Sequence, residues 1–188
     1  ISGVLGPWSG NLPNAGGTVR LRKPSDAIVW QADYNDRPPW PVAADGTGHS
    51  LVLARPSYGE SNPQAWAASH RIGGSPGAAD PVPSADLDHL VINEVLANFN
   101  PPMTNFIEIH NLSPLAVDVS NCYLSDQRNA LTKYQFPPAT SIGPQGFLAV
   151  EEATLGFALN ADGESVFLTS PDGLRVLAIG DHGIRDDG

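Results

Sequence analysis

The sequence predicts an all-β fold of short antiparallel strands with little helix. Apolar segments are short, and turn-forming residues separate them throughout 90–124. Within Phe106–His110, Ile107 and Ile109 alternate with their neighbours, which is the period of a strand and not of a helix. The 188 residues include 19 glycines and 18 prolines without a low-complexity run, as in a loop-rich β protein.

The first half of the chain is expected to hold one hairpin, one further strand and one helical turn. Lys23-Pro24-Ser25-Asp26 is predicted as the hairpin turn, because proline presets φ and Ser or Asp supplies local hydrogen bonds. Asn62 followed by Pro63 predicts an N-cap and the first position of a helical turn. The strands are expected over 18–21, 27–32 and 51–54, and the rest of 35–80 is expected to be irregular.

The second half is expected to consist of strands joined by turns. Asp172-Gly173 is a strong signal for a two-residue hairpin turn between the last two strands. The strands are predicted over 90–96, 106–110, 115–124, 133–136, 147–151, 165–169 and 175–179.

The acidic composition limits the choice of partners. The net charge is −10 and the pI is about 4.6, so phosphate backbones repel the chain and nucleic acid is not expected as a partner. The basic cluster of Arg20, Arg22 and Lys23 is interpreted as a solvated strand face. No window approaches the length of a membrane span. The single cysteine, Cys122, excludes an intrachain disulfide.

An internal repeat relates the two halves. LPNAGGTVRLRKPSDAIV from Leu12 aligns without a gap on LNADGESVFLTSPDGLRV from Leu159, an offset of 159 − 12 = 147. The matching positions are strand-core and turn positions, so both segments are predicted to build the same hairpin. That offset is the size of a domain and not of a solenoid repeat. Its register indicates a window on a longer array, with two hairpins that are similar by chance as the alternative. The start at Ile1 and not at Met suggests a processed product or a fragment.

Five segments follow one another over 90–179: VINEV, NFIEIHN, VDVSNCYLSD, KYQFPPATSIGPQGFLAV and LNADGESVFLTSPDG. This succession resembles the bacterial lamin tail domain. In the first half, DRPPWP, DGTGHSLVL, NPQAW and IGGSPGA are similar to the usual ending of that family. Cys122 departs from the family by replacing a common Trp, which requires compensating packing, and His110 stands where an aromatic residue is common.

The resemblance implies an immunoglobulin-like β-sandwich, and the expectation of about seven short strands agrees with it. It assigns residues 1–80 to the C-terminal part of a first lamin-tail-like domain and 81–88 to a linker. Residues 89–188 then form a second such domain, truncated at its C-terminal end. Similar domains are accessory modules of large secreted or surface proteins of bacteria, and no catalytic residues are known for them.

No set of residues predicts an enzyme. The five histidines form no metal-type pair at short spacing, and no nucleophile elbow occurs. Glu108 and His110 share a strand face, with Glu94 nearby if the strands pair. Such a set could hold a metal or move a proton, but a half-exposed polar face is the preferred interpretation. Cys122 is interpreted as a small core residue, because a catalytic thiol needs a depressed pKa and access.

Two loop features suggest a ligand. Asp162, Glu164 and Asp172 lie in one predicted hairpin region, and calcium needs several such oxygens at one point. Solvated turns are the alternative. Trp8 and Trp40 lie in Pro/Gly-rich loops, where exposed rings can stack on sugars or anchor a protein partner. Rings that plug the loops are the alternative.

Two functions therefore stay open. The leading hypothesis is a non-catalytic structural or interaction module of a larger extracellular or cell-surface bacterial protein. Its partners would be proteins or neighbouring copies of itself, and it would need no cofactor. The alternative is a polysaccharide- or calcium-binding accessory domain attached to an enzyme. The two partial copies are expected either to complete one sheet or each to need its own missing half.

Overall fold

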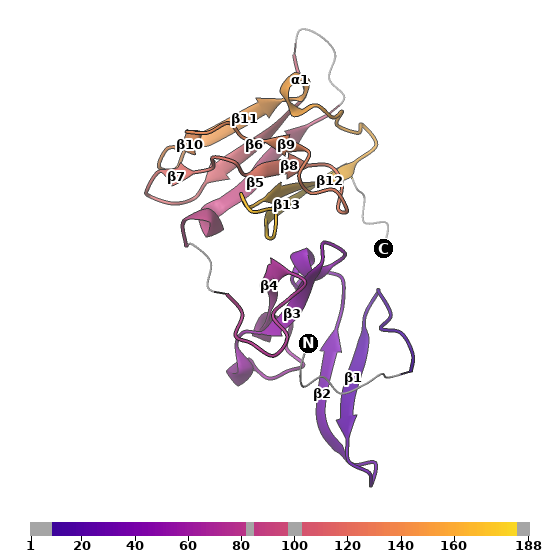
Figure 1. Cartoon of the computed structure of the whole chain (residues 1–188). Coiled ribbons are helices and arrows are strands. Elements are labelled where there is room, and N and C mark those ends of the chain that lie inside the picture. The colour runs from indigo at the N-terminus through magenta and orange to yellow at the C-terminus, as the bar shows by residue number, and fades with distance from the viewer. Residues whose placement is uncertain (1–8, 82–84, 98–102, 184–188) are drawn as a thin grey trace. The chain divides into compact units, whose positions relative to one another are not determined.

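The computed structural model describes residues 9–81, 85–97 and 103–183. The chain divides into two compact units, residues 1–82 (unit 1) and 83–188 (unit 2). Within the described residues nearly all regular structure is antiparallel β-strand, and the single α-helix is four residues long (Figure 1). The prediction of an all-β, antiparallel fold with little helix is confirmed.

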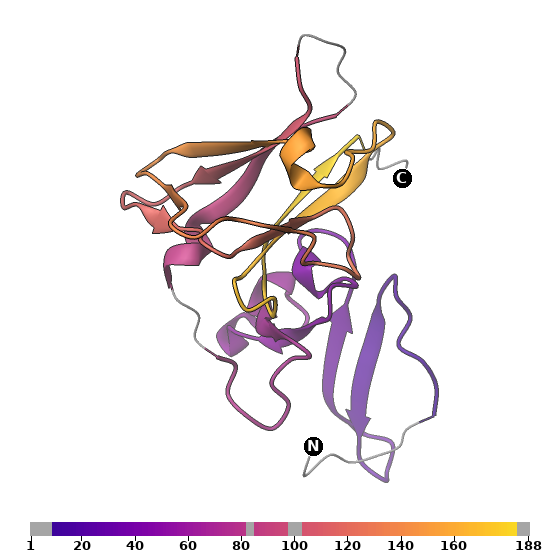
Figure 2. The same cartoon turned by 45° about the horizontal axis from the view of Figure 1, so that its top comes forward.

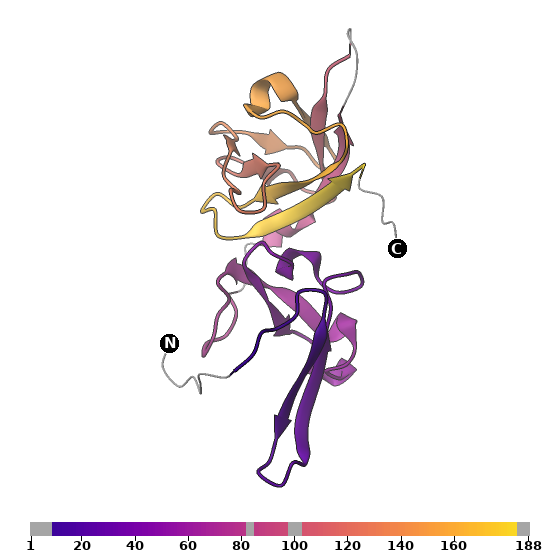
Figure 3. The same cartoon turned by 90° about the vertical axis from the view of Figure 1, so that its right-hand side faces the viewer.

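Unit 1 consists of two separate two-stranded sheets. One is the hairpin of β1 (Gly17–Arg22) and β2 (Ile28–Tyr34), and the other pairs β3 (His49–Leu53) with β4 (Trp66–Ile72). Figure 3 shows the β1–β2 hairpin extending beyond β3 and β4. The connections contain the short 3-10 turns η1 (Val42–Ala44), η2 (Pro56–Tyr58) and η3 (Pro63–Ala65).

The sequence correctly predicted the helical turn η3 but did not predict strand β4. The Asn62 side chain accepts a hydrogen bond from the Gln64 N–H at 3.0 Å, so the predicted N-cap is confirmed. Strand β4 falls in a region expected to be irregular. Its sequence WAASHRI has no regular apolar alternation, and alanine has little β propensity. Pairing with β3 therefore determines its conformation.

Unit 2 is a β-sandwich. One sheet has the strand order β11-β6-β5 and the other β13-β12-β8-β9, with β7 and β10 as a separate short pair (Figures 1 and 2). The first sheet contains β5 (Leu90–Leu96), β6 (Phe106–Asn111) and β11 (Phe147–Glu151). The second contains β8 (Tyr123–Ser125), β9 (Tyr134–Gln135), β12 (Glu164–Thr169) and β13 (Val176–His182). The short elements are η4 (Ala85–His89), β7 (Val117–Asp118), β10 (Ser141–Ile142) and α1 (Glu152–Leu155).

The core of unit 2 lies between its two sheets. Ile107 and Ile109 of β6 point inward and are fully buried, as their alternation predicts. They share one apolar cluster with Leu124 of β8 and with Val166 and Leu168 of β12. Each fully buried aliphatic side chain contributes about 1.5–3 kcal/mol, so this cluster is the main source of unit 2's stability.

A buried amide fixes the loops at one end of the sandwich. Asn111 is fully buried, and its Nδ2 lies 2.8 Å from the Leu115 carbonyl oxygen, 3.1 Å from that of Ile142 and 2.9 Å from that of Gly143. Its Oδ1 accepts a hydrogen bond from the Ser113 N–H at 2.8 Å. One side chain thus hydrogen-bonds backbone groups of two loops, and the bonds to the Ile142 carbonyl and the Ser113 N–H are buried.

Two predictions about connections are wrong. The expected single strand over 115–124 is two strands, β7 and β8, because a turn separates them at Asn121, where φ is 62°. The expected two-residue turn at Asp172-Gly173 is a longer loop between Thr169 and Val176. The Asp172 carboxylate accepts hydrogen bonds from the Ser170 hydroxyl at 2.5 Å and the Leu174 N–H at 3.0 Å, which stabilises that loop.

The β1–β2 and β12–β13 hairpins have the same register. Each has six residue pairs, running from Gly17 and Tyr34 in the first hairpin and from Glu164 and His182 in the second. Each has its irregularity at the same step, after Leu21 and after Leu168. The offset is 164 − 17 = 147 in the first strand and 182 − 34 = 148 in the second. The gap-free alignment is therefore wrong for the second strand, because the second hairpin's turn has one more residue.

The turns flanking the two hairpins also match. Gly16 and Gly163 precede the first strands with φ of 117° and 106°, conformations that favour glycine. In the hairpin turns, Asp26 and Gly173 have φ of 65° and 69°. The N–H of each donates to the carbonyl three residues earlier, at 2.9 Å in both turns. The shared geometry extends from the strands into both turns.

Replacing Asn111 by alanine tests the buried amide. Asn111→Ala removes the buried hydrogen bonds to the Ser113 N–H and the Ile142 carbonyl, and we expect a loss of about 3 kcal/mol in the free energy of unfolding. Urea denaturation followed by circular dichroism measures it. The matched control is Asn129→Ala at an exposed position, for which a change within about 0.5 kcal/mol is expected. Equal effects of the two substitutions would contradict the role of Asn111.

Candidate functional site

The face of the β1–β2 hairpin that corresponds to the inward face of β12–β13 is open at Leu21, whereas Ala32 on the same face is only 5% exposed. Leu21 is 58% exposed, whereas Leu168, at the corresponding position of β12, is fully buried. Val19 is half-buried, whereas its counterpart Val166 is fully buried. The two hairpins share register and residue type at these positions. The difference in burial therefore comes from what covers them and not from the hairpins themselves.

An apolar hollow lies beside this face within unit 1. It has a volume of about 340 Å³, and residues from both sheets of unit 1 line it. Two indole rings contribute, one from β2 and one from the start of β4, and the Trp66 Nε1–H donates to the Glu60 carbonyl at 2.9 Å. Its apolar lining includes Leu12, Val19, Trp30, Ala32, Leu51 and Trp66.

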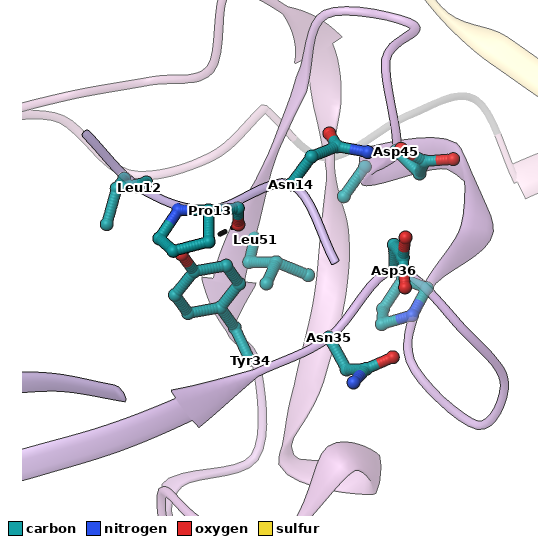
Figure 4. Close-up of a pocket in the computed structure, with 10 residues that line it drawn as sticks. Leu12, Pro13, Asn14, Tyr34, Asn35, Asp36, Asp45 and Leu51 are labelled. Atoms are coloured by element: carbon teal, nitrogen blue, oxygen red, sulfur yellow. Dashed lines mark hydrogen bonds between the residues drawn. The ribbon is translucent and has the colours of Figure 1, made fainter. Parts of the chain in front are cut away.

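A second hollow of unit 1, of about 180 Å³, is more polar (Figure 4). The Tyr34 hydroxyl donates to the Pro13 carbonyl oxygen at 3.0 Å at one side of it. Asp36 and Asp45 lie at the other side, and Asp36 Oδ1 is buried without a hydrogen-bond partner. Two carboxylates do not complete a cation site, and no group of three or more acidic, histidine or cysteine ligands occurs among the described residues.

Of the two tryptophans predicted to bind a ligand, Trp40 lies within the described residues and is mostly buried. Trp40 is only 9% exposed, and its ring lies 6.3 Å from that of Trp66 between centroids, tilted by 40°. A ring so placed packs against unit 1 and offers little surface for stacking on a sugar. Trp8 lies outside the described residues.

The three carboxylates suggested for calcium do not converge. Glu164 begins β12 and Asp172 follows its far end, a separation of about 17 Å along the strand. The Glu164 carboxylate accepts a hydrogen bond from the Asn160 N–H at 2.9 Å and lies 3.7 Å from His182 Nε2. The Asp172 carboxylate accepts a hydrogen bond within its own turn. The exposed Asp162 precedes Glu164 by two residues, at the start of β12. The set therefore divides into two turn-stabilising groups.

On the polar face of the β11-β6-β5 sheet, β5 and β6 pair, which the sequence alone did not determine. Glu94 lies opposite Glu108 across the β5–β6 ladder, and Glu108 Oε1 accepts a hydrogen bond from Asn93 Nδ2 at 2.7 Å. His110 stacks on Phe147, with ring centroids 4.1 Å apart and planes 14° from parallel. The imidazole thus packs on an aromatic ring and not on a carboxylate, which favours a half-exposed strand face over an acid–base pair.

Cys122 is a core residue. Its side chain is fully buried in the unit 2 cluster, and burial raises the pKa of its thiol to about 12, with the negative charges of Asp118 and Asp172 acting in the same direction. A thiol that stays protonated and inaccessible is a poor nucleophile. The prediction that Cys122 belongs to the core is confirmed.

The described residues thus define an all-β, immunoglobulin-like protein, and the ranges 9–81, 85–97 and 103–183 contain no group of three or more His, Cys, Asp or Glu side chains that could hold a metal ion. A family model for the lamin tail domain matches residues 83–182. This match covers more than half of the 188 residues, and the chain belongs to the lamin tail domain family. That family consists of immunoglobulin-like modules that are in general non-catalytic. The comparison with curated proteins gives no match.

Sequence motifs did not single out the exposed apolar side chain of Leu21. The available signal was the internal repeat, which aligns Leu21 with the core residue Leu168. None of the helices in the described ranges has the length and apolar character that a bilayer crossing requires.

The raised pKa of Cys122 predicts an alkaline loss of stability. Because the thiol's pKa is higher in the folded state, the unfolded state loses its proton first as the pH rises above 9.0, the ordinary value. The Cys122 contribution is then fully present below pH 9 and falls by about 1.4 kcal/mol per pH unit until the pH reaches about 12. Urea denaturation of wild type and Cys122→Ala across this range measures it. A stability difference between them that does not shrink with pH would contradict the assignment.

Proposed function

We propose that the chain is a structural and interaction module, and that residues 1–80 are the C-terminal part of a preceding lamin-tail-like domain. One observation carries the proposal. The β1–β2 hairpin has the register, irregularity and turns of β12–β13, yet its core-type Leu21 is 58% exposed. An apolar face of this kind, beside an apolar hollow, is typical of a protein–protein contact.

A repetitive assembly explains why two copies of one hairpin occur in a single chain. Each lamin-tail-like unit would contact its neighbours, and partial copies would be completed by the units beside them. We infer that the parent protein is bacterial and is secreted or displayed on the cell surface, as expected from the resemblance. The acidic net charge of −10 favours solubility of such an array and disfavours contact with nucleic acid.

The alternative, a polysaccharide- or calcium-binding accessory domain attached to an enzyme, has less support. Trp40 is 9% exposed, Glu164 and Asp172 stabilise turns at opposite ends of β12, and Asp162 is exposed. No arrangement of the described residues favours a sugar or calcium over a protein partner.

The proposed function predicts self-association through unit 1. The unpaired edge of β1 and the open face allow weak pairing between copies, so the apparent mass should rise with concentration in sedimentation experiments. Leu21→Asp places a charge on the face and should abolish the rise. The matched control is Leu115→Asp, because Leu115 is 69% exposed and belongs to unit 2. A strictly monomeric wild type, or association that survives Leu21→Asp, would argue against the module.

Calcium addition tests the alternative. A genuine site at a calcium concentration one hundred times its Kd would stabilise the fold by about 2.7 kcal/mol. Because the three predicted carboxylates do not converge, we expect no shift of the thermal midpoint relative to magnesium. A calcium-specific upward shift that Glu164→Gln removes would restore the calcium hypothesis.

A further inference from the structure

We propose that β1 of one copy adds to the free edge of β11 in a second copy, with Arg20 and Arg22 beside the carboxylates on the outer face of that copy's sheet. This inference rests on the proposed function and names the surface that the β1–β2 hairpin contacts. The core of each unit stays as it is. Because the two surfaces differ, every copy can give one such contact and receive another, so the contact extends an array.

The tip of the β1–β2 hairpin projects from unit 1. Every residue from Arg20 to Val29 is exposed, and Figure 3 shows the hairpin extending beyond β3 and β4. Three of these residues are large and apolar, with Leu21 58%, Ile28 51% and Val29 54% exposed. In the described part of unit 1, β1 pairs only with β2, so its other edge is free. A free edge with exposed apolar side chains is suited to adding to another sheet.

The edge of β11 in unit 2 is also free among the described strands. β11 is the outer strand of the β11-β6-β5 sheet (Figure 1). The Gly146 carbonyl and the Glu152 N–H both bond to the segment 105–111 of β6 and its start, at 2.9 and 2.8 Å. Ladder bonds alternate along an antiparallel strand, so the odd-numbered residues of β11 direct their backbone groups away from β6. These groups are available to an added strand.

The ladder bonds of β1 alternate in a compatible way. The Lys23 N–H donates to the Ala27 carbonyl at 2.9 Å, on the β2 side. The even-numbered residues of β1 therefore direct their backbone groups to its free edge. They can form ladder bonds with the odd-numbered residues of β11. In that arrangement Leu21 lies opposite an even-numbered residue of β11, on the interior side of the sheet.

A hollow lies where this leucine would enter. Its volume is about 410 Å³, and residues of β11 and β9, the edge strands of the two sheets of unit 2, line it. Leu148 and Val150 contribute from β11, and Tyr134 and Phe136 from β9 and the residue after it. Residues directly opposite each other in a ladder share a face, so Leu21 opposite Val150 would place its side chain at this hollow.

The outer face of the same sheet has the complementary charge. Strands β5, β6 and β11 contain Glu94, Glu108 and Glu151 and no lysine or arginine. Glu94 lies directly opposite Glu108, and like charges in such a pair repel. Residues 1–82 contain six basic and six acidic side chains, whereas 83–188 contain four basic and fourteen acidic ones. Charge therefore favours contact between unit 1 of one copy and unit 2 of another.

One register satisfies both the hollow and the charges. With Leu21 opposite Val150, Arg22 lies opposite Ala149. The residue beyond Ala149 is Glu108 of β6, two strand spacings or about 10 Å from the added strand. Because the alanine side chain is small, the guanidinium of Arg22 can extend across it to the Glu108 carboxylate.

The two arginines are available for this contact. Arg20 lies opposite Glu151 in the same register, and its Nε donates to the neutral side chain of Gln31 at 2.7 Å. Arg22 pairs with Asp26 at 2.9 Å, and both side chains are exposed. An exposed ion pair contributes little to stability, so a second carboxylate can share or replace it.

Two charge reversals test the two surfaces separately. The hairpin variant has Arg20→Glu and Arg22→Glu, and the edge variant has Glu108→Arg and Glu151→Arg. We expect each variant alone to associate at least about tenfold more weakly than the wild type in sedimentation experiments. Mixed in equal amounts, the two variants should form a heterodimer with one copy of each, because the hairpin of one and the edge of the other keep the wild-type contact.

The control variant changes the net charge of unit 2 by the same amount at another place. Asp162→Arg and Asp181→Arg lie at exposed positions, before β12 and in β13, and should leave the association constant within about twofold. Ala149→Pro tests the edge without a charge, because it removes an N–H that points to the free edge, and should also prevent association. Slow reaction of the buried Cys122 thiol verifies that the core of unit 2 is intact in each variant.

Each outcome supports or overturns the contact. If the edge variant associates as the wild type does, or if the mixture stays monomeric, the partner surface is not the edge of β11, and the inference fails while the proposed function stands. Loss of association in the hairpin variant alone is the pattern of two β1 strands that pair with each other. A wild type that is monomeric at every concentration overturns the proposed function as well.

Discussion

A β-hairpin cannot bury both its edges and its apolar face by itself, and this constraint underlies both units. Each strand of a hairpin has one paired edge, and inward side chains need a second layer. In unit 2, β8 and β13 occupy the two edges of β12, and the β11-β6-β5 sheet supplies the layer. The result is a continuous core. Unit 1 repeats the hairpin without these neighbours among its described residues, and its core-type leucine faces solvent.

The functional argument depends on this contrast. The polar side chains that were candidates for a site each make a local contact. The Glu164 carboxylate accepts a hydrogen bond from a backbone N–H, the Asp172 carboxylate accepts one within its turn, and His110 stacks on Phe147. Cys122 is protonated and enclosed. On the β1–β2 hairpin, by contrast, Leu21 and Ile28 are more than half exposed, although their counterparts Leu168 and Val176 in unit 2 are buried. This contrast supports the proposed role of the chain as a module that acts by contact with other proteins.

Much of the fold could be predicted from the sequence, because strand periodicity and turn residues are local. The alternation around Ile107 and the Asn62 cap were sufficient for β6 and η3. β4 could not be predicted, since its conformation depends on pairing with β3 across a loop. The candidate site was harder. Exposure of Leu21 depends on which strands are present, and Trp40 was placed by its packing on Trp66 and not by the loop composition around it.

Hydrogen–deuterium exchange compares the two hairpins most directly, because one chain contains both. Amides of β12 lie in a core strand with both edges paired, whereas those of β1 lie in a strand with one paired edge. We expect the amides of 164–169 to exchange at least about a hundredfold more slowly than those of 17–22. Equal protection of the two strands would mean that β1 is already covered, and would contradict the claim that unit 1 offers an open face to a partner.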